Sequence, residues 1–493
     1  MTLSIAMNWV VILDVIYVII LILVCLRIIY DTTSTNKTLA YLLLVIFIPI
    51  AGILFYFSLG TNYRKRRIYS KKLVEDDALG RQVVEAVISK TELNLQHDVR
   101  VIGEAKSLVK LLLKDSYSPL TTGNAVKLLI NGEQKFPEVF KALESARHHI
   151  HIEYYIYEND IVGNEIKDIL IRKAKEGVKV RLIYDAFGSR SIRKKFVREL
   201  RAAGAEAWPF NRIRFILLAN PINYRNHRKI IVVDGKCGFV GGMNISDRYI
   251  NDPKYKKKKK RKLYWRDTHI RIDGPGVQYL QYLFFCDWNF CANQKLQPDN
   301  LYFDTRNNPD GNENVQIAAS GPDSPTSTIM LSLVKAINLA KKEILLTTPY
   351  FIPGETIMNA LKVASLGGVQ IKIIAPGISD SRLVNAAAWS YYDDMLSAGV
   401  EIYLYQKGFI HVKTMVIDDL ISIVGTANMD FRSFDVNFEV NAIVYGPKLA
   451  GELRATFAED LLDSDKIQPE TWRQRPVFKQ FPERVARLLS PLL

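Results

Sequence analysis

Histidine, lysine, aspartate and asparagine recur at the same spacing in two places along the chain. The segments "HRKIIVVD" (227–234) and "HVKTMVID" (411–418) both read His-x-Lys-x-x-x-x-Asp, and each is followed by six residues, two small residues, any residue and Asn. The polar residues of the two copies are His227, Lys229, Asp234 and Asn244, then His411, Lys413, Asp418 and Asn428. Lysine is rarely buried without a partner, so an imidazole and an ammonium at the start of an apolar run indicate a site that receives an anion.

The apolar, β-branched residues that follow each lysine predict a strand, and its period of two puts the histidine and the lysine on one face. A single His-x-Lys pair at a strand edge is most often an exposed polar pair. This chain has only seven histidines, and two of them open the same composite pattern. Chance therefore explains the repetition poorly.

The two motifs close two similar series of predicted elements. Residues 141–157 resemble 335–351, residues 176–185 resemble 367–376, and residues 202–208 resemble 397–403, each pair reading as helix and strand. Helices that alternate with apolar strands predict an α/β layered sheet in each half. We expect a helical linker over 63–118, a first domain over 119–295, a linker rich in Asn, Asp and Pro over 296–318, and a second domain over 319–493.

The first 62 residues are predicted to form a membrane hairpin. Two apolar runs, at about 9–29 and 38–59, are each near the ~20 residues that a helix needs to cross a bilayer. A cleaved signal peptide is the alternative for the first run, but the start of the chain has no basic residue and a second run follows. The basic cluster at 64–67 then predicts that both termini and the catalytic domains face the cytoplasm.

The formal net charge of +15 predicts attraction to polyanions, either nucleic acid or an anionic membrane. Four cysteines without paired spacing indicate neither a disulfide framework nor a zinc site. The run "KYKKKKKRK" (254–262) is interpreted either as a solvated loop or as a segment that attaches to anionic lipid.

The paired motif resembles that of the phospholipase D superfamily. The similarity continues in "HIHIEYYIYEND", "NYRNHRK", "YWRDTHIRI", "TTPYFIPGE", "TANMDFRSFDVNFEVN" and the final "RLLSPLL", which together resemble the bacterial cardiolipin synthases of that superfamily. The resemblance covers essentially the whole chain and implies two α-β-α sandwich domains that share a pseudo-twofold active site. The wider superfamily often has Gly-Ser where this chain has Gly241-Gly242 and Gly425-Thr426.

The resemblance also implies roles for single residues. His227 would be the nucleophile and His411 the general acid, although near-symmetry allows the reverse order. Phosphate oxygens would be held by Lys229, Lys413, Asn244 and Asn428. Asp267 and Glu439 would orient the imidazoles, and Asp234 and Asp418 would brace the motif. No metal and no cofactor is expected.

The reaction implied by the resemblance converts two phosphatidylglycerol molecules into cardiolipin and glycerol through a phosphatidyl-histidine. The expected enzyme is a multi-pass protein of the bacterial cell membrane that binds phosphatidylglycerol and anionic lipids and no nucleic acid. The alternatives are a phosphodiesterase for nucleic acid, a membrane-bound phospholipase D that uses water, and a non-catalytic membrane scaffold. The two apolar runs disfavour the first, and two intact motifs disfavour the last.

Overall fold

The computed structural model describes residues 2–32, 35–57, 88–95, 102–210, 224–256, 263–292, 294, 296, 301–303, 308 and 310–493. The chain forms two compact units, one comprising 1–70 with 212–224 and the other comprising 71–211 with 225–493. The predicted basic cluster at 64–67 and residues 257–262 of the lysine run lie outside the described residues.

In the residues that the structure describes, the first unit contains the helices α1 (Thr2–Asp31), α2 (Thr35–Phe47) and α3 (Pro49–Phe55). Within α1, residues Trp9–Asp31 are long and apolar enough to cross a membrane. The second predicted span is helical but broken, because α2 ends beside Ile48 and Pro49 begins α3. Proline lacks the N–H and sterically disfavours a helical residue before it, which explains the bend. Val24 and Ile28 of α1 pack with Val45 of α2, so α1 and α2 form a hairpin.

The second unit is built around one sheet of fifteen strands. The strands of its first half are β1 (Thr121–Ile130), β2 (His149–Tyr154), β3 (Lys179–Asp185), β4 (Glu206–Phe210), β5 (Lys229–Val233), β6 (Cys237–Gly241) and β8 (Thr268–Asp273). Those of its second half are β9 (Glu313–Ser320), β10 (Glu343–Thr347), β12 (Gln370–Pro376), β13 (Glu401–Tyr405), β15 (Thr414–Ile417), β16 (Ile421–Gly425), β18 (Glu439–Tyr445) and β19 (Ser464–Lys466). Four short strands lie outside this sheet: β7 (Tyr264–Arg266) pairs with β14 (Gly408–Ile410), and β11 (Phe351–Ile352) pairs with β17 (Met429–Asp430).

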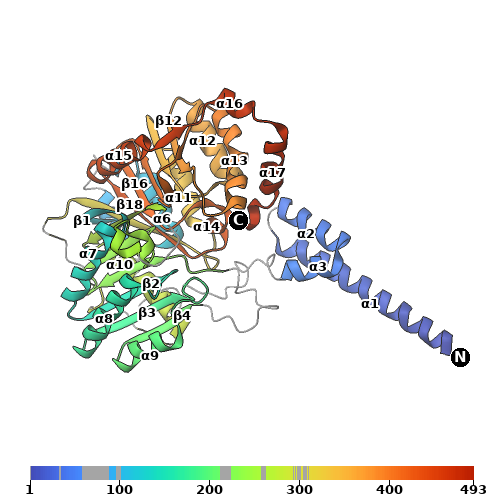
Figure 1. The fold of residues 1–493 in the computed structure, drawn as a ribbon, viewed down its shortest axis with the longest axis horizontal. Coiled ribbons are helices and arrows are strands. Elements are labelled where there is room, and N and C mark those ends of the chain that lie inside the picture. Colours follow the sequence, from blue (N-terminus) through green and yellow to red (C-terminus); the bar gives the residue numbers. More distant parts are fainter. Residues whose placement is uncertain are drawn as a thin grey trace. The chain divides into compact units, whose positions relative to one another are not determined.

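The strand order repeats about the middle of the sheet. It runs β19-β13-β12-β10-β15-β16-β18-β9, then β1-β8-β6-β5-β2-β3-β4, so that β9 and β1 join two series of equivalent strands. Figure 1 labels β1 to β4 of one series and β12, β16 and β18 of the other. The two strands that follow the His-x-Lys motifs, β5 and β15, hold the same place in each series. This arrangement is the pseudo-twofold relation that the duplicated sequence predicts.

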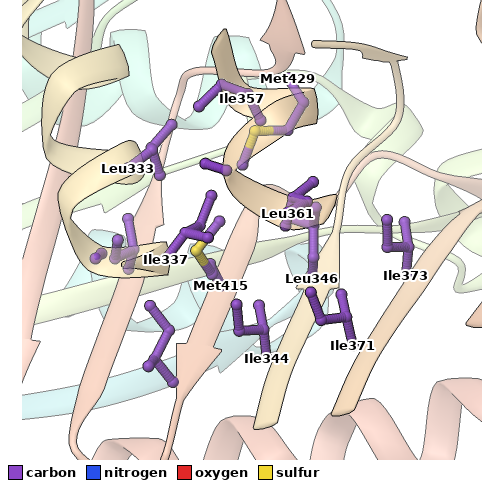
Figure 2. Close-up of a cluster of buried hydrophobic side chains, with 14 of the residues drawn as sticks. Leu333, Ile337, Ile344, Leu346, Ile357, Leu361, Ile371, Ile373, Met415 and Met429 are labelled. Atoms are coloured by element: carbon purple, nitrogen blue, oxygen red, sulfur yellow. The ribbon is translucent and has the colours of Figure 1, made fainter. Parts of the chain in front are cut away.

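Helices cover the sheet in both halves. They are α6 (Lys106–Ser116), α7 (Asn131–Ser145), α8 (Ile161–Lys175), α9 (Lys194–Ala202), α10 (Val277–Ala292), α11 (Thr328–Ile337), α12 (Gly354–Leu366), α13 (Arg382–Ser397), α14 (Phe431–Asp435), α15 (Pro447–Leu462), α16 (Pro469–Arg473) and α17 (Val477–Leu488). Figure 2 shows α11 and α12 packed over β10, β12 and β15 through Leu333, Leu361, Leu346 and Met415. A different core contains side chains of both halves, including Ile230 of β5, Val416 of β15, Leu280 of α10 and Leu453 of α15. Because this core is shared, the two halves bury apolar surface against each other.

Candidate active site

Each histidine of the repeated motif lies just before a central strand, and each lysine lies at or beside its first residue. Lys229 begins β5, and Lys413 directly precedes β15. All four side chains are buried. The ammonium of Lys229 donates to the carbonyl of His227 at 2.7 Å, and that of Lys413 donates to the carbonyl of His411 at 2.6 Å. The two lysines are therefore fixed in equivalent positions beside the two imidazoles.

The backbone of each histidine is hydrogen-bonded to the other half of the sheet. The N–H of His227 donates to Phe438 O at 2.9 Å, and the N–H of His411 donates to Arg266 O at 2.7 Å. The residues that follow these two carbonyls are Glu439 and Asp267. Each histidine segment therefore lies against the segment of the other half that carries a carboxylate.

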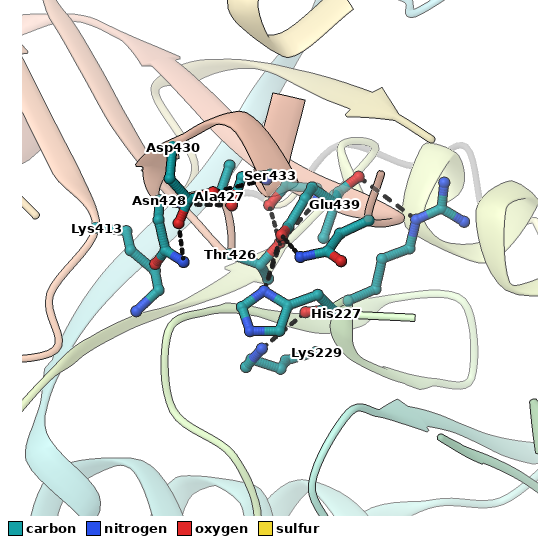
Figure 3. A network of polar contacts seen from close by, with 12 residues as sticks. His227, Lys229, Lys413, Thr426, Ala427, Asn428, Asp430, Ser433 and Glu439 are labelled. Atoms are coloured by element: carbon teal, nitrogen blue, oxygen red, sulfur yellow. Dashed lines mark hydrogen bonds and ion pairs between the residues drawn. The ribbon is translucent and has the colours of Figure 1, made fainter. Parts of the chain in front are cut away.

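The imidazoles and the carboxylates pair across the two halves. His227 Nδ1 lies 2.9 Å from Glu439 Oε2, and His411 Nδ1 lies 2.7 Å from Asp267 Oδ2. A carboxylate on Nδ1 fixes the tautomer and directs Nε2 to the opposite side of the ring. Figure 3 shows the first of these pairs, with Lys229 beside His227, and with Lys413 and Asn428 in the same group of polar side chains. The structure thus makes one paired constellation from residues of both halves.

Burial and nearby positive charge hold the site ready for an anion. Burial lowers the pKa of Lys229 to about 7 and that of Lys413 to about 8, and each ammonium acts on the imidazoles of both halves. Burial and then Lys413 lower the pKa of His411 to about 3, against the opposing effect of Asp267. Burial also lowers the pKa of His227, which Glu439 partly offsets. A bound phosphate would supply the missing negative charge and favour the protonated forms of all four groups.

The two motif asparagines have protein partners in the structure. Asn244 Nδ2 donates to the Tyr249 hydroxyl at 2.6 Å, and its Oδ1 accepts from the Ile156 N–H at 3.2 Å. Asn428 Nδ2 donates to Asp430 Oδ2 at 3.0 Å. An amide nitrogen carries two hydrogens, so each side chain keeps a second N–H for a ligand. Their contact with phosphate stays a prediction.

The structure does not bring Asp234 and Asp418 to the histidines. They lie at the opposite ends of β5 and β15, where both have positive φ, 53° and 51°. Asp234 accepts the backbone N–H groups of Arg147, His148 and His149, and Asp418 accepts those of the three residues from 341 to 343. Each aspartate thereby ties the turn after the motif strand to the start of the neighbouring strand.

One position differs between the halves beside the orienting carboxylates. The Thr426 hydroxyl donates to Glu439 Oε2, whereas Gly242 occupies the equivalent place in the first half. A Cβ atom on Gly242 would meet Asp267 Oδ1 at 2.2 Å. Thr426 therefore supports Glu439, which pairs with His227, and Gly242 leaves room for Asp267, which pairs with His411.

Several neighbours of the site were not singled out from the sequence. The ring centres of His227 and Tyr155 lie 4.9 Å apart, and His411 lies among the rings of Trp265, Phe409 and Tyr249. Asn226 also holds the segment around His227, because its side chain donates a hydrogen bond to Glu153. In the sequence, only its place beside the histidine could have indicated this role. In the part of the chain that the structure describes, no group of three His, Cys, Asp or Glu residues is arranged to hold a metal ion.

Comparison with known proteins agrees with the geometry. A family model described as "Cardiolipin synthase, PLD-like domain" matches residues 139–254 and 333–461. The chain is 39% identical to a cardiolipin synthase of Alkalihalophilus pseudofirmus, with 98% of this chain and 94% of that protein covered. It is also 39% identical to the major cardiolipin synthase ClsA of Bacillus subtilis, with 98% and 99% covered. Among solved structures, phosphatidylserine synthase of Haemophilus influenzae has the same fold, with a TM-score of 0.58, 13% identity, and 78% of this chain and 100% of that chain covered.

Proposed function

Because this chain belongs to the cardiolipin synthase family of enzymes with phospholipase D-like domains, we propose that it joins two phosphatidylglycerol molecules at the site between His227 and His411. The observation that carries the proposal is the crossed pairing of each imidazole with the carboxylate of the other half. Crossed pairing supplies two oriented imidazoles and two ammonium groups to one phosphodiester.

The proposed first step is displacement at the phosphorus of the donor lipid. His227 Nε2 attacks phosphorus, the P–O bond to the terminal glycerol breaks, and His411 gives its proton to the departing oxygen. A phosphatidyl-histidine and free glycerol result. Glu439 stabilises the positive charge that develops on His227, while Lys229 and Lys413 hold the non-bridging oxygens.

The second step is the reverse exchange with a different alcohol. A hydroxyl of the second phosphatidylglycerol loses its proton to His411 and attacks phosphorus, and the P–N bond to His227 breaks. Cardiolipin leaves and both histidines return to their starting states. One phosphodiester replaces another, so the reaction needs no nucleotide.

The pKa of His411, about 3 without substrate, leaves this imidazole neutral, so its role as the acid requires bound phosphate. The anionic phosphate offsets the effect of the Lys413 ammonium, so His411 takes up a proton when substrate is bound. After it protonates glycerol, it is a neutral imidazole ready to accept the proton of the incoming hydroxyl.

The proposed location is the cell membrane, with α1 and the α2–α3 segment as two passes. The exposed apolar side chains of α1 support a lipid-facing helix. The basic cluster at 64–67 supports a cytoplasmic position for the catalytic half of the chain.

The test is to incubate the purified protein with phosphatidylglycerol alone, in the presence of chelator and without nucleotide. Cardiolipin and glycerol in equal amounts are expected. Phosphatidic acid alone would indicate hydrolysis, and no product would favour a scaffold. His227→Ala and His411→Ala should each abolish turnover, whereas His148→Ala, outside the site, should retain it. Substantial turnover in either site variant would contradict a shared site.

A further inference from the structure

The proposed product contains two phosphates, but the two motifs account for only one. During the second step, one phosphorus is bonded to histidine while the phosphate of the second lipid lies a glycerol bridge away. That second phosphate is anionic and must also be desolvated when the acceptor lipid binds. The residues around His227 contain a cationic group that the mechanism above does not use.

Arg225 and Arg190 share one aromatic ring beside His227. The guanidinium carbon of Arg225 lies 4.4 Å from the ring centre of Phe187, and that of Arg190 lies 4.0 Å from it. Arg432 acts on Arg225 electrostatically, as Arg190 does, and both disfavour its charged form. Two guanidinium groups thus lie against one ring, and Arg432 acts on Arg225 as a further positive charge.

Burial lowers the pKa of Arg225, and the negative charge of Asp185 partly offsets this effect. The oxygens of Asp185 are also engaged by backbone N–H groups. Asp185 accepts the N–H groups of Phe187 and Gly188 at 2.9 Å and that of Asn226 at 3.2 Å. Arg225 is 5% exposed, and among the residues that the structure describes its Nη1 has no hydrogen-bond partner. A buried guanidinium with an unused donor is costly unless a ligand completes it.

Arg225 is also placed to reach the same substrate as His227. Asn226 forms a bridge with Phe438, so its neighbours Arg225 and His227 point to the side of the segment opposite to Asn226. Tyr155 links them, because its ring contacts His227 and its hydroxyl is sensitive to the charges of Arg225 and Arg432. The equivalent residue, two positions before His411, is the uncharged Phe409.

We propose that Arg225, together with Arg190, binds the phosphodiester of the acceptor phosphatidylglycerol. This subsite rests on the proposed function and deepens it. Arginine forms paired hydrogen bonds with phosphate oxygens, which suits recognition of a second phosphodiester. By favouring a lipid with its own phosphate over water, the subsite would direct the phosphatidyl-histidine toward cardiolipin.

The test compares two acceptors for the same phosphatidyl-histidine. Labelled free glycerol, which has no phosphate, exchanges into phosphatidylglycerol, whereas phosphatidylglycerol itself gives cardiolipin. Arg225→Gln should lower cardiolipin formation roughly 10- to 100-fold, the range for a lost charged hydrogen bond, while glycerol exchange stays within about twofold. Arg225→Lys should fall between, and Arg198→Gln, an exposed arginine of α9, should change neither rate.

Three outcomes would overturn the subsite. Equal loss of both reactions would mean that Arg225 only supports the fold or His227. Unchanged cardiolipin formation would mean that it binds nothing in the reaction. Weaker binding to lipid vesicles with an unchanged ratio of the two rates would assign the arginines to a bilayer lipid. Failure of the proposed function would look different, because the unsubstituted protein would then form no cardiolipin.

A separate feature, the outer face of α17, points to a second contact with lipid. Val477, Phe478, Phe481 and Leu488 of this helix are 78%, 73%, 64% and 79% exposed. The opposite face is fixed, since Arg487 donates to Ser390 O at 3.1 Å and to Asp394 Oδ2 at 3.0 Å on α13. The apolar face is therefore held outward by the fold.

We infer that this apolar face lies in the interface of an anionic bilayer. The segment 469–493 has five Lys or Arg residues, of which Arg473, Arg475 and Arg487 are held in ion pairs. Lys479 and Arg484, which no described ion pair engages, complement anionic headgroups. Such a helix, apolar on one side and basic beside it, is typical of interfacial helices.

Spin labels on the full chain, reconstituted in vesicles of phosphatidylglycerol and phosphatidylcholine, test this contact. A label at Phe481→Cys should be accessible to oxygen and shielded from a water-soluble nickel complex, whereas a label at Lys479→Cys, on another side of α17, should be accessible to nickel. The labelled unsubstituted chain gives the background of the four native cysteines. Equal access of the nickel complex to both labels would refute the inference. It would also be refuted if the label at Phe481→Cys is shielded from nickel in detergent only when two chains associate.

Discussion

The crossed pairing of carboxylates and imidazoles predicts which histidine each carboxylate controls. In Asp267→Asn, the negative charge beside His411 is lost while His227 keeps Glu439. The affected contact, His411 Nδ1 to Asp267 Oδ2, is 2.7 Å long and buried on both sides. A hydrogen bond to a charged group contributes about 1.5–3 kcal/mol, which corresponds to a roughly 10- to 150-fold fall in the rate of cardiolipin formation.

The sign of the pKa change follows from the same contact. Asp267 raises the pKa of His411 against the effects of burial and Lys413, so its removal lowers that pKa below about 3. The substrate-bound imidazole would then hold a smaller fraction of the proton that the leaving glycerol needs. Glu439→Gln should act in the same way on His227 and not on His411.

Nitrogen NMR of histidine-labelled protein separates the two sites. Asp267→Asn should shift the ring nitrogens of His411, assigned from His411→Ala, and leave those of His227 in place. Asp273→Asn, which breaks a partly exposed ion pair with Arg271 on β8, is the matched control and should change neither the spectra nor turnover. A shift at His227 in Asp267→Asn would refute the crossed arrangement, because it would mean that each half completes its own histidine.

Three further predictions concern other parts of the chain. Gly242→Ala should reduce turnover about as much as Asp267→Asn, since its Cβ would meet Asp267 Oδ1 at 2.2 Å. Thr426→Val should reduce turnover only roughly 2- to 10-fold, and Thr426→Ser should have near-normal turnover. Equal effects of Gly242→Ala and Thr426→Ser would contradict this prediction. Burial and then His148 lower the pKa of His149 to about 4, below the unfolded value near 6.5. The free energy of unfolding should therefore fall by about 3 kcal/mol as the pH drops from 6.5 to 4. A thermal unfolding midpoint that does not change over this pH range would argue against a neutral buried imidazole. Deletion of residues 256–260 should weaken flotation with anionic vesicles, by up to ~1 kcal/mol per lysine, and spare turnover in detergent; unchanged flotation would leave the run as a solvated loop.

Local features of the site could be predicted from the sequence because they depend on neighbours in the chain. The strand after each motif follows from its apolar residues, and the turn at Asp234 follows from the residue types that tolerate positive φ. The break at Ile48 shows the limit of counting apolar residues, since Pro49 interrupts a run that is otherwise long enough for one helix. The hairpin was predicted from hydropathy, whereas its bend depends on backbone sterics.

The partners of the histidines could not be predicted in this way. Asp267 and Glu439 occupy matching places after the two motifs, so spacing alone favours neither partner for His227. The choice depends on the bridge between Asn226 and Phe438 and on the pairing of β7 with β14, contacts between residues far apart in the chain. No local pattern encodes the register of such contacts, which is set by the fold as a whole.

The crossed arrangement has a consequence for how the two halves diverge. Since each imidazole depends on a carboxylate of the opposite half, neither half contains a complete site, and their shared core ties them into one folding unit. Substitutions in one half therefore change the chemistry of the histidine in the other. Thr426 supports Glu439, which pairs with His227. Two residues before the histidine, the first half has the charged Arg225 and the second half has the apolar Phe409. Any difference in role between the two histidines must therefore come from the residues around them, because the motif itself is the same in both copies.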